Sequence, residues 1–362
     1  MNRIVVVGAG IAGTSAAYHL TEQTDAEVLV VDRGDIGSET TVRSTAVFRQ
    51  MGDPVLDPMK RYALEIYNEF LGDPRTDVEF HLIGRLEAAT ADGSDIEATE
   101  SVRSFDPNEL GSAVVFPELD TDAITGAVYQ PNAGIFDPVA LAEEFAARAR
   151  DRGAAFRTGA VVTDISVERK RVTGVELGDE TVEASHVVAA AGPWNRELAA
   201  MAGADLPQRH TLAPILRLEP DEAFTHTLPN LKLDSGNYLL GQPDGTVLVG
   251  HSPGGYADAG TEYDPDEVSD TVPDDLRAEM LEAVGTVVPA LADAEVIEEW
   301  VGVRSLTPDG LPVVGELQEG LSVMAFNSEG IQLAPAAGRV VTAEVAGRED
   351  EFAGDVSPSR FA

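Results

Sequence analysis

The first thirty residues alternate between apolar and glycine-rich segments. Residues 4–7 form a short apolar, β-branched run that ends in the glycine-rich residues 8–13, and residues 14–20 have the pattern of a helix. A second apolar run at 28–31 ends at Asp32. This order predicts a strand, a helix and a second strand, which is typical of a βαβ unit.

Later segments repeat these patterns. Residues 137–153 predict a helix, with proline in its first turn and glycine just past its end. Residues 161–177 alternate like a small meander, and the continuous apolar run 187–191 favours a parallel strand buried on both faces. Near the C-terminus, 321–325 predicts a strand and 331–345 a helix with one apolar side.

Two regions depart from this pattern, because they are richer in proline and glycine and contain alternating strands, for example at 209–218 and 238–249. A chain of 362 residues also exceeds what one compact core usually holds. We therefore predict an α/β fold, in which a Rossmann-like nucleotide-binding domain carries an inserted antiparallel α+β substrate domain. The predicted nucleotide-binding domain comprises 1–77, 128–205 and 295–362, and the predicted substrate domain comprises 78–127 and 206–294.

Composition adds a large negative charge. The chain has 63 Asp and Glu against 25 Lys and Arg, a formal net charge of -38. The acids are spread along the chain, which indicates a solvated acidic surface rather than a partner-binding tail. Such a surface disfavours nucleic acid and anionic lipid as partners, and it repels itself unless salt screens it. We expect a salt-adapted protein from a halophile; an ordinary acidic mesophile protein is the alternative.

The chain contains no cysteine, which excludes disulfides, thiolate chemistry, iron–sulfur ligation and a cysteinyl-linked cofactor. No stretch approaches the ~18 apolar residues of a membrane span, and the N-terminal apolar run is too short for a signal peptide. We expect a cytoplasmic protein. The histidines show no paired spacing typical of a metal site, so no metal is expected.

The motif Gly8-x-Gly10-x-x-Gly13 has a mechanical interpretation. Gly8 makes a tight turn, Gly10 lets the backbone approach a pyrophosphate, and Gly13 lets helix and strand pack closely. The helix N-terminus then favours the anion. Asp32 follows about 20 residues later, where a carboxylate hydrogen-bonds the adenosine ribose. The alternatives are a chance glycine turn and, for Asp32, an ordinary turn residue.

Four further segments, Glu39–Ala46, Ala190–Trp194, Gly302–Gly315 and Asn327–Pro335, occur in a recognisable order. They resemble the signature segments of the D-amino acid oxidase superfamily, which includes glycine oxidase, sarcosine oxidase and several amino acid dehydrogenases. The resemblance covers nearly the whole chain and implies one FAD extended between the two domains. No second glycine motif follows a strand, which disfavours a pyridine-nucleotide disulfide reductase. Because the chain lacks cysteine, and 38–50 lacks histidine, we expect the FAD to be noncovalent.

The resemblance also assigns cofactor contacts. The segment that begins at Ser38 would follow the diphosphate toward the flavin, Val162 would meet adenine through its backbone, and Gly192 would pass close to the cofactor. The N-terminus of the predicted helix 331–345 would face the flavin pyrimidine, where reduction places negative charge; a plain packing helix is the alternative. The predicted cofactor-binding residues are Gly8, Gly10, Ile11, Ala12, Gly13, Asp32, Arg33, Thr41, Arg43, Ser44, Thr45, Ala46, Val162, Ala191, Gly192, Trp194, Arg304, Asn327, Gly330, Ile331 and Gln332.

Arg304 is the principal candidate for substrate binding. A planar guanidinium binds a carboxylate through two parallel hydrogen bonds, and the family places this arginine above the flavin. Arg49 matches a second substrate-side arginine more loosely, and Tyr238 is placed to hold a carboxylate or amine, with His251 as a further candidate. Structural salt bridges for the arginines, and plain packing for Tyr238, are the alternatives.

The implied reaction moves a hydride from the α-carbon of a small amino acid or secondary amine to flavin N5, and water hydrolyses the resulting imine. Gln332 stands where monomeric sarcosine oxidases have a lysine associated with oxygen activation, so the acceptor stays open between oxygen and a quinone or other electron carrier. The alternatives are a 2-hydroxy-acid or glycerol-3-phosphate-type dehydrogenase on the same scaffold, and a non-catalytic or electron-relay subunit of a complex.

The net charge predicts that stability depends on salt. Lowering the ionic strength from 1 M to 0.1 M lengthens the Debye length from ~3 Å to ~10 Å, which restores repulsion between surface carboxylates. We expect the melting temperature to fall on dialysis from molar to 0.1 M potassium chloride, measured by calorimetry at constant pH. A melting temperature that does not change with potassium chloride would contradict salt adaptation.

Overall fold

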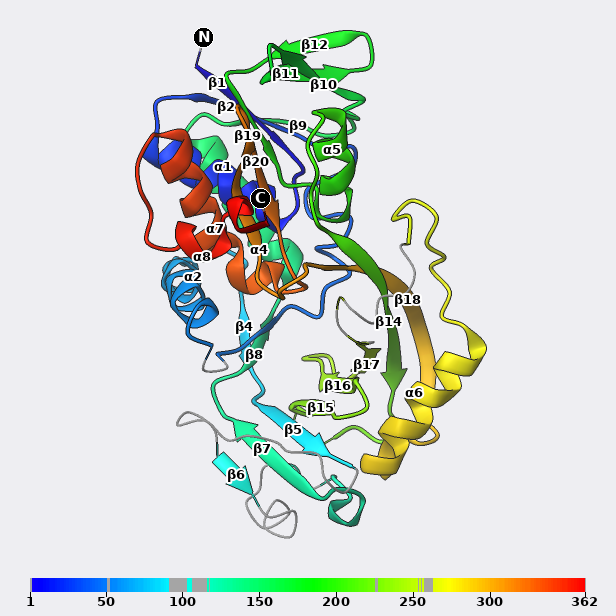
Figure 1. The fold of residues 1–362 in the computed structure, drawn as a ribbon. Helices are drawn as coiled ribbons and strands as arrows, with labels where there is room; N and C mark the ends of the chain where they lie inside the picture. The colour runs from blue at the N-terminus through cyan, green and yellow to red at the C-terminus, as the bar shows by residue number, and fades with distance from the viewer. Residues whose placement is uncertain are drawn as a thin grey trace.

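A mostly parallel sheet organises the upper half of the molecule in Figure 1. The computed structural model describes residues 2–50, 53–90, 103–105, 116, 118–224, 227–252, 254, 256 and 263–361. The first sheet has six strands in the order β19-β20-β13-β1-β2-β9. Strands β1 (Arg3–Val7), β2 (Glu27–Val31), β9 (Ala155–Arg157), β13 (His186–Ala189) and β20 (Leu321–Ala325) run parallel, and β19 (Val313–Gln318) pairs antiparallel with β20.

Both faces of this sheet are covered, as the continuous apolar runs predict. One face packs against helices α1 (Ile11–Gln23), α4 (Pro138–Asp151) and α7 (Gly330–Val345), with α2 (Leu56–Leu71) packed on α7 and α8 (Ala353–Val356) against β19. The other face packs against α5 (Asn195–Met201) and a small sheet of β10 (Asp164–Glu168), β11 (Arg171–Leu177) and β12 (Glu180–Glu183). The predicted βαβ unit and meander are therefore confirmed.

Local sequence signals explain two of the helices. The Asp137 carboxylate caps α4 by accepting hydrogen bonds from the backbone N–H groups of Val139 (2.8 Å) and Ala140 (3.0 Å), as an N-cap aspartate is expected to do. Helix α2 was not predicted, although Met59, Ala63 and other buried residues recur there at helical spacing.

An eight-stranded sheet forms the lower half, in the order β18-β14-β17-β16-β15-β5-β7-β6. Every neighbouring pair is antiparallel except β15 with β5. Its strands are β5 (Arg85–Ala89), β6 (Arg103–Phe105), β7 (Gly126–Gln130), β14 (Arg209–Glu219), β15 (Asn230–Leu233), β16 (Asn237–Gly241), β17 (Val247–His251) and β18 (Glu295–Leu306). Helix α6 (Asp274–Val287) packs on one face, which leaves the other face directed toward the first half.

A third sheet of β3 (Val47–Phe48), β8 (Gly134–Phe136) and β4 (Phe80–Leu82) joins the halves. Strand β18 begins at Glu295, where the sequence analysis places the start of the third nucleotide-binding segment, yet β18 pairs with β14 along almost its full length. The predicted boundary at 295 therefore falls before a strand of the eight-stranded sheet. The domain division otherwise stays a prediction. Among the described helices, none has the length and apolar content needed to cross a bilayer.

Helices α1 and α2 enclose a neutral histidine. His19 is fully buried, its Nδ1 lies 2.8 Å from the Ser15 carbonyl oxygen and its Nε2 lies 3.0 Å from the Tyr62 hydroxyl. Because a carbonyl only accepts, Nδ1 carries the proton and Nε2 accepts from the tyrosine. Burial lowers the pKa of His19 to about 4.

This pKa predicts acid sensitivity of the fold. Below the unfolded pKa of about 6.5, the unfolded chain binds a proton that the folded chain excludes, so stability is lost as the pH falls from 6.5 toward 4. We expect His19→Gln to remove about 2–3 kcal/mol of this loss, measured as the difference in unfolding free energy between pH 7.5 and 4.5 at constant salt. Equal pH dependence in wild type and variant would show that His19 does not contribute.

Candidate active site

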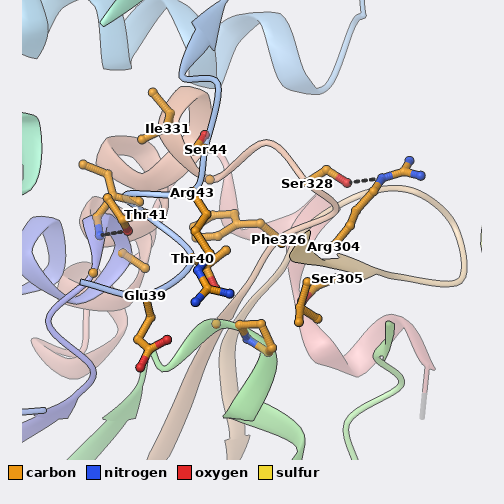
Figure 2. Close-up of a pocket in the computed structure, with 18 of the residues that line it drawn as sticks. Glu39, Thr40, Thr41, Arg43, Ser44, Arg304, Ser305, Phe326, Ser328 and Ile331 are labelled. Carbon is orange, nitrogen blue, oxygen red and sulfur yellow. Dashed lines mark hydrogen bonds between the residues drawn. The ribbon is translucent and has the colours of Figure 1, made fainter. Parts of the chain in front are cut away.

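A cavity of about 760 Å³ lies between the two large sheets. Figure 2 shows the segment from Glu39 to Ser44 on one side of it and Arg304 with Ser328 on the other. The residues predicted to bind cofactor or substrate line this cavity, except Gly13, which packs behind it, and the further candidate His251. The structure thus brings the predicted set together, while the role of each residue stays a prediction.

The glycine motif forms the tight turn between the end of β1 and the start of α1. Gly8 has a φ of +110°, and a Cβ there would lie 2.5 Å from the Ala190 carbonyl oxygen. A Cβ on Gly13 would lie 1.8 Å from the Gly8 carbonyl oxygen, so only glycine allows this approach of helix and strand. The Thr41 hydroxyl accepts a hydrogen bond from the Ile11 amide at 3.1 Å, which ties the start of α1 to the 39–46 segment.

Asp32 holds the glycine loop from the end of β2. Its carboxylate accepts from the Ala9 amide at 2.5 Å and from the Gly34 amide at 2.7 Å. Burial raises the pKa of Asp32, and these two hydrogen bonds oppose that shift. Asp32 therefore shapes the loop in addition to lining the cavity where the ribose contact is predicted.

Arg33 is already engaged by protein groups. Its guanidinium stacks 4.0 Å from the centroid of the Trp194 ring and forms ion pairs with Asp266 (2.8 Å) and Glu39 (3.4 Å). The Trp194 indole N–H also donates to Asp266, at 3.1 Å. Sequence reasoning missed Asp266, because it lies more than 200 positions from Arg33 in the chain. Exposed carboxylates of Glu197 and Asp264 lie close to Asp266.

The 39–46 segment crosses from the first sheet to the eight-stranded sheet. Arg43 donates to the Val301 carbonyl oxygen at 3.2 Å and pairs with Asp270 at 3.1 Å, and the Arg43 carbonyl accepts from the Trp300 indole at 3.3 Å. The Arg43 guanidinium therefore holds the 39–46 segment against β18. The sequence predicted a cofactor contact for Arg43 but not this structural contact.

The N-terminus of α7 is held in place by α2. Pro335 has no N–H to donate to the Ile331 carbonyl one turn earlier, and the buried Tyr67 hydroxyl donates to that oxygen at 2.5 Å instead. The Gln332 amide donates to the Glu329 carbonyl at 3.1 Å. This amide already has an acceptor, so the amides of Gly330 and Ile331 are the better candidates for the predicted flavin contact.

Arg304 and Tyr238 lie on the cavity face of the eight-stranded sheet. Arg304 donates through Nε to the Ser328 hydroxyl at 2.8 Å and through Nη1 to the Gly254 carbonyl at 3.4 Å. The Tyr238 ring lies directly over Gly250, where a Cβ would come within 2.2 Å of the ring carbon bearing the hydroxyl. Burial raises the pKa of Tyr238 to about 12, which keeps its hydroxyl protonated as a donor.

Arg49 and Lys60 share one carboxylate. Glu329 lies 3.2 Å from Arg49 Nη2 and 3.0 Å from the Lys60 ammonium, which is 1% exposed. The Lys60 contact is an ion pair that lacks hydrogen-bond geometry. The Gln332 side-chain oxygen accepts from the Arg49 amide at 3.0 Å, so Gln332 positions the Arg49 backbone. The sequence analysis did not anticipate the roles of Lys60 and Glu329.

Two remaining candidates have structural contacts. His251 Nδ1 lies 3.1 Å from the Asn237 side-chain oxygen, and His251 is absent from the described cavity lining. Burial lowers the pKa of His251. The Asn327 side chain accepts from the Thr307 amide at 3.3 Å and so joins the loop before α7 to the end of β18.

Comparison with known proteins decides the family. A family model described as FAD dependent oxidoreductase matches residues 3–344. The chain belongs to this family. It is 27% identical to an uncharacterized oxidoreductase of Bacillus subtilis, over 99% of this chain and 98% of the relative. It is 25% identical to the glycine oxidase of Pseudomonas putida strain KT2440, over 96% of this chain and 95% of the relative.

Two solved structures share the fold. The L-proline dehydrogenase from P. horikoshii superposes with a TM-score of 0.84 at 23% identity, covering 99% of this chain and 97% of the other. The glycine oxidase from Geobacillus kaustophilus superposes with a TM-score of 0.80 at 21% identity, covering 99% and 98%. The predicted α/β fold and the assignment to the D-amino acid oxidase group are therefore confirmed.

The residues present fit FAD. The cavity runs from the Gly8–Gly10 turn and Val162 to the start of α7, so one continuous space offers a glycine turn for a pyrophosphate and a helix N-terminus for the flavin. Gly10 keeps this path open, because a Cβ there would lie 3.0 Å from the Thr41 hydroxyl. Among the described lining residues there is no histidine, and the chain has no cysteine.

This lining predicts that the flavin is noncovalent. We expect the purified protein to be yellow and acid precipitation to release all its flavin as FAD, because the common histidyl and cysteinyl attachment residues are missing from the described lining. Absorbance of the supernatant and chromatography of the released flavin measure this. Yellow colour that stays in the precipitated protein would disprove noncovalent attachment.

Proposed function

We propose that this FAD-dependent oxidoreductase oxidises a small amino acid or secondary amine at the carbon next to the nitrogen. The observation that carries the proposal is the placement of Arg304 and Tyr238 on one face of the sheet, at the end of the cavity that also receives the N-terminus of α7. A cation and a neutral donor together suit a carboxylate-bearing substrate.

Arg304 would hold the substrate carboxylate. Its Nε–H is committed to Ser328, and this bond orients the guanidinium plane from one edge. Burial lowers the pKa of Arg304, but a guanidinium stays charged at neutral pH. Tyr238 would add a hydrogen bond, since its raised pKa keeps the hydroxyl protonated. Two points of attachment fix the orientation of a small substrate, which supplies much of the rate acceleration.

When bound, FAD accepts the hydride that leaves the carbon bearing the nitrogen. The chain's own residues then have a limited task. They bind the neutral amine, orient its C–H bond and exclude competing water, after which water hydrolyses the imine product. The lining residue Glu329 already pairs with Arg49 and Lys60, so it is a poor candidate for a general base.

Arg304 provides the decisive substitution. Arg304→Ala removes both charge and fork, whereas Arg304→Lys keeps the charge and loses the planar pair of donors. A charge-assisted hydrogen bond contributes roughly 1.5–3 kcal/mol, so we expect Arg304→Ala to lower kcat/KM about ten- to 160-fold, with Lys intermediate. Anaerobic reduction of the flavin by a panel of amino acids, amines and 2-hydroxy acids gives the rates and the substrate class.

Two controls accompany this test. An amine without a carboxylate should be a poor substrate for wild type and nearly insensitive to the substitution. Arg171→Ala removes an exposed arginine that pairs with Glu319, and it should leave turnover unchanged. Loss of FAD or of the fold in Arg304→Ala, with normal turnover in the remaining holoenzyme, would make Arg304 structural and refute the proposal.

A further inference from the structure

Strand register places four polar side chains near one another on the cavity face of the eight-stranded sheet. Asn230 lies opposite Arg85 on β5, and Lys232 lies opposite Tyr238 on β16. The alternate residues of β15, including Leu231, point into the core on the other face. Arg85, Asn230, Lys232 and Tyr238 all line the cavity.

Arg85 is a fixed, buried cation in this row. It is 5% exposed, its Nε and Nη2 contact the Glu87 carboxylate at 2.8 Å, and Nη1 donates to the Asn230 side-chain oxygen. Burial lowers the pKa of Arg85 to about 10, and the neighbouring Arg49 acts in the same direction. Both contacts fall on one oxygen of Glu87, Oε1, so Glu87 compensates the charge of Arg85.

Lys232 lies opposite Glu87 in the pairing of β15 with β5, but Glu87 forms its ion pair with Arg85 rather than with Lys232. Lys232 is half-buried, and among the described residues none forms a hydrogen bond or an ion pair with its ammonium. Burial lowers the pKa of Lys232, and Arg85, Arg49 and Arg304 lower it further, whereas only Glu87 raises it. Among the acidic residues that the structure describes, none forms an ion pair with this lysine. An uncompensated cation in a partly buried cavity is costly unless an anion joins it.

We infer that Lys232, supported by Arg85, forms a second anion subsite, and that the substrate carries a second carboxylate besides the one assigned to Arg304. This inference rests on the proposed function. Lys232 is one strand beyond Tyr238, a spacing of about 4.8 Å, whereas Arg304 lies on β18, with β14 and β17 between β18 and β16. The second carboxylate would therefore bind beside Tyr238, on the side away from Arg304. The second carboxylate belongs either to the side chain of an acidic amino acid or to an N-carboxyalkyl group.

The first test measures binding without turnover. Succinate and butyrate have four carbons each but two carboxylates and one, respectively. Titration of the FAD-loaded protein with each, by calorimetry at constant ionic strength, should show succinate binding roughly ten- to hundredfold more tightly. Lys232→Met should bring this ratio toward one. Lys170→Met removes the exposed lysine of the β10–β11 turn and should leave the ratio unchanged.

The second test identifies the source of the carboxylate. Anaerobic flavin reduction is compared for glutamate against norvaline, in both enantiomers, and for iminodiacetate against sarcosine. Faster reduction by glutamate than by norvaline indicates a side-chain carboxylate, and faster reduction by iminodiacetate than by sarcosine indicates an N-carboxyalkyl group. Lys232→Met should abolish either preference. If no amine reduces the flavin but succinate still binds through Lys232, the proposed function fails and the subsite stands. Equal affinity for succinate and butyrate in wild type, or an unchanged ratio in Lys232→Met, overturns the inference.

Discussion

The arrangement of the site depends on the two ion pairs that the Glu329 carboxylate forms. It lies just before α7 and pairs with Arg49 from the 39–50 segment and with Lys60 from α2. Removing it would leave Lys60 as an unpaired charge in the interior, and breaking a buried pair in this way typically costs about 3–5 kcal/mol. One acid therefore fixes the start of α7 relative to two elements that the chain must bring from elsewhere, and Tyr67 reinforces the same point through the Ile331 carbonyl.

Basic residues gather in the cavity although the chain as a whole is strongly acidic. The chain has a formal net charge of -38, yet Arg49, Arg85, Lys232 and Arg304 all line one cavity. Of the three lysines, Lys60 is buried, Lys232 lines the cavity, and only Lys170 is exposed. The described cavity lining as a whole is balanced, with six acidic and six basic residues, but Glu329 is the acidic lining residue beside Arg49, whereas Asp32, Asp35, Glu39, Glu197 and Asp266 line the part near Arg33. The part with Arg49, Arg85, Lys232 and Arg304 therefore favours an anionic group.

Much of the fold could be predicted from the sequence, because its strongest signals are local. The β1–α1–β2 unit, the N-cap of α4 and the strand 321–325 follow from apolar periodicity, glycine spacing and capping chemistry. The contacts of Arg33 with Asp266 and of Arg43 with Val301 join positions more than 200 residues apart, which no local pattern reveals. Helix α2 has a helical pattern from which local periodicity could have predicted it, whereas the long pairing of β18 with β14, which begins at 295, joins distant segments that no local pattern reveals.

The two kinds of charge in this protein respond differently to salt. Surface carboxylates interact through water, so added ions weaken their repulsion over a few ångströms. The pairs around Glu329 and Arg85 are half-buried or buried and are screened much less. Salt should therefore act mainly on the stability of the folded chain and much less on the geometry of the cavity. It follows that an effect of salt on substrate affinity, measured where the protein is fully folded, reports screening between the anion and the protein's charges rather than a change in the geometry of the site.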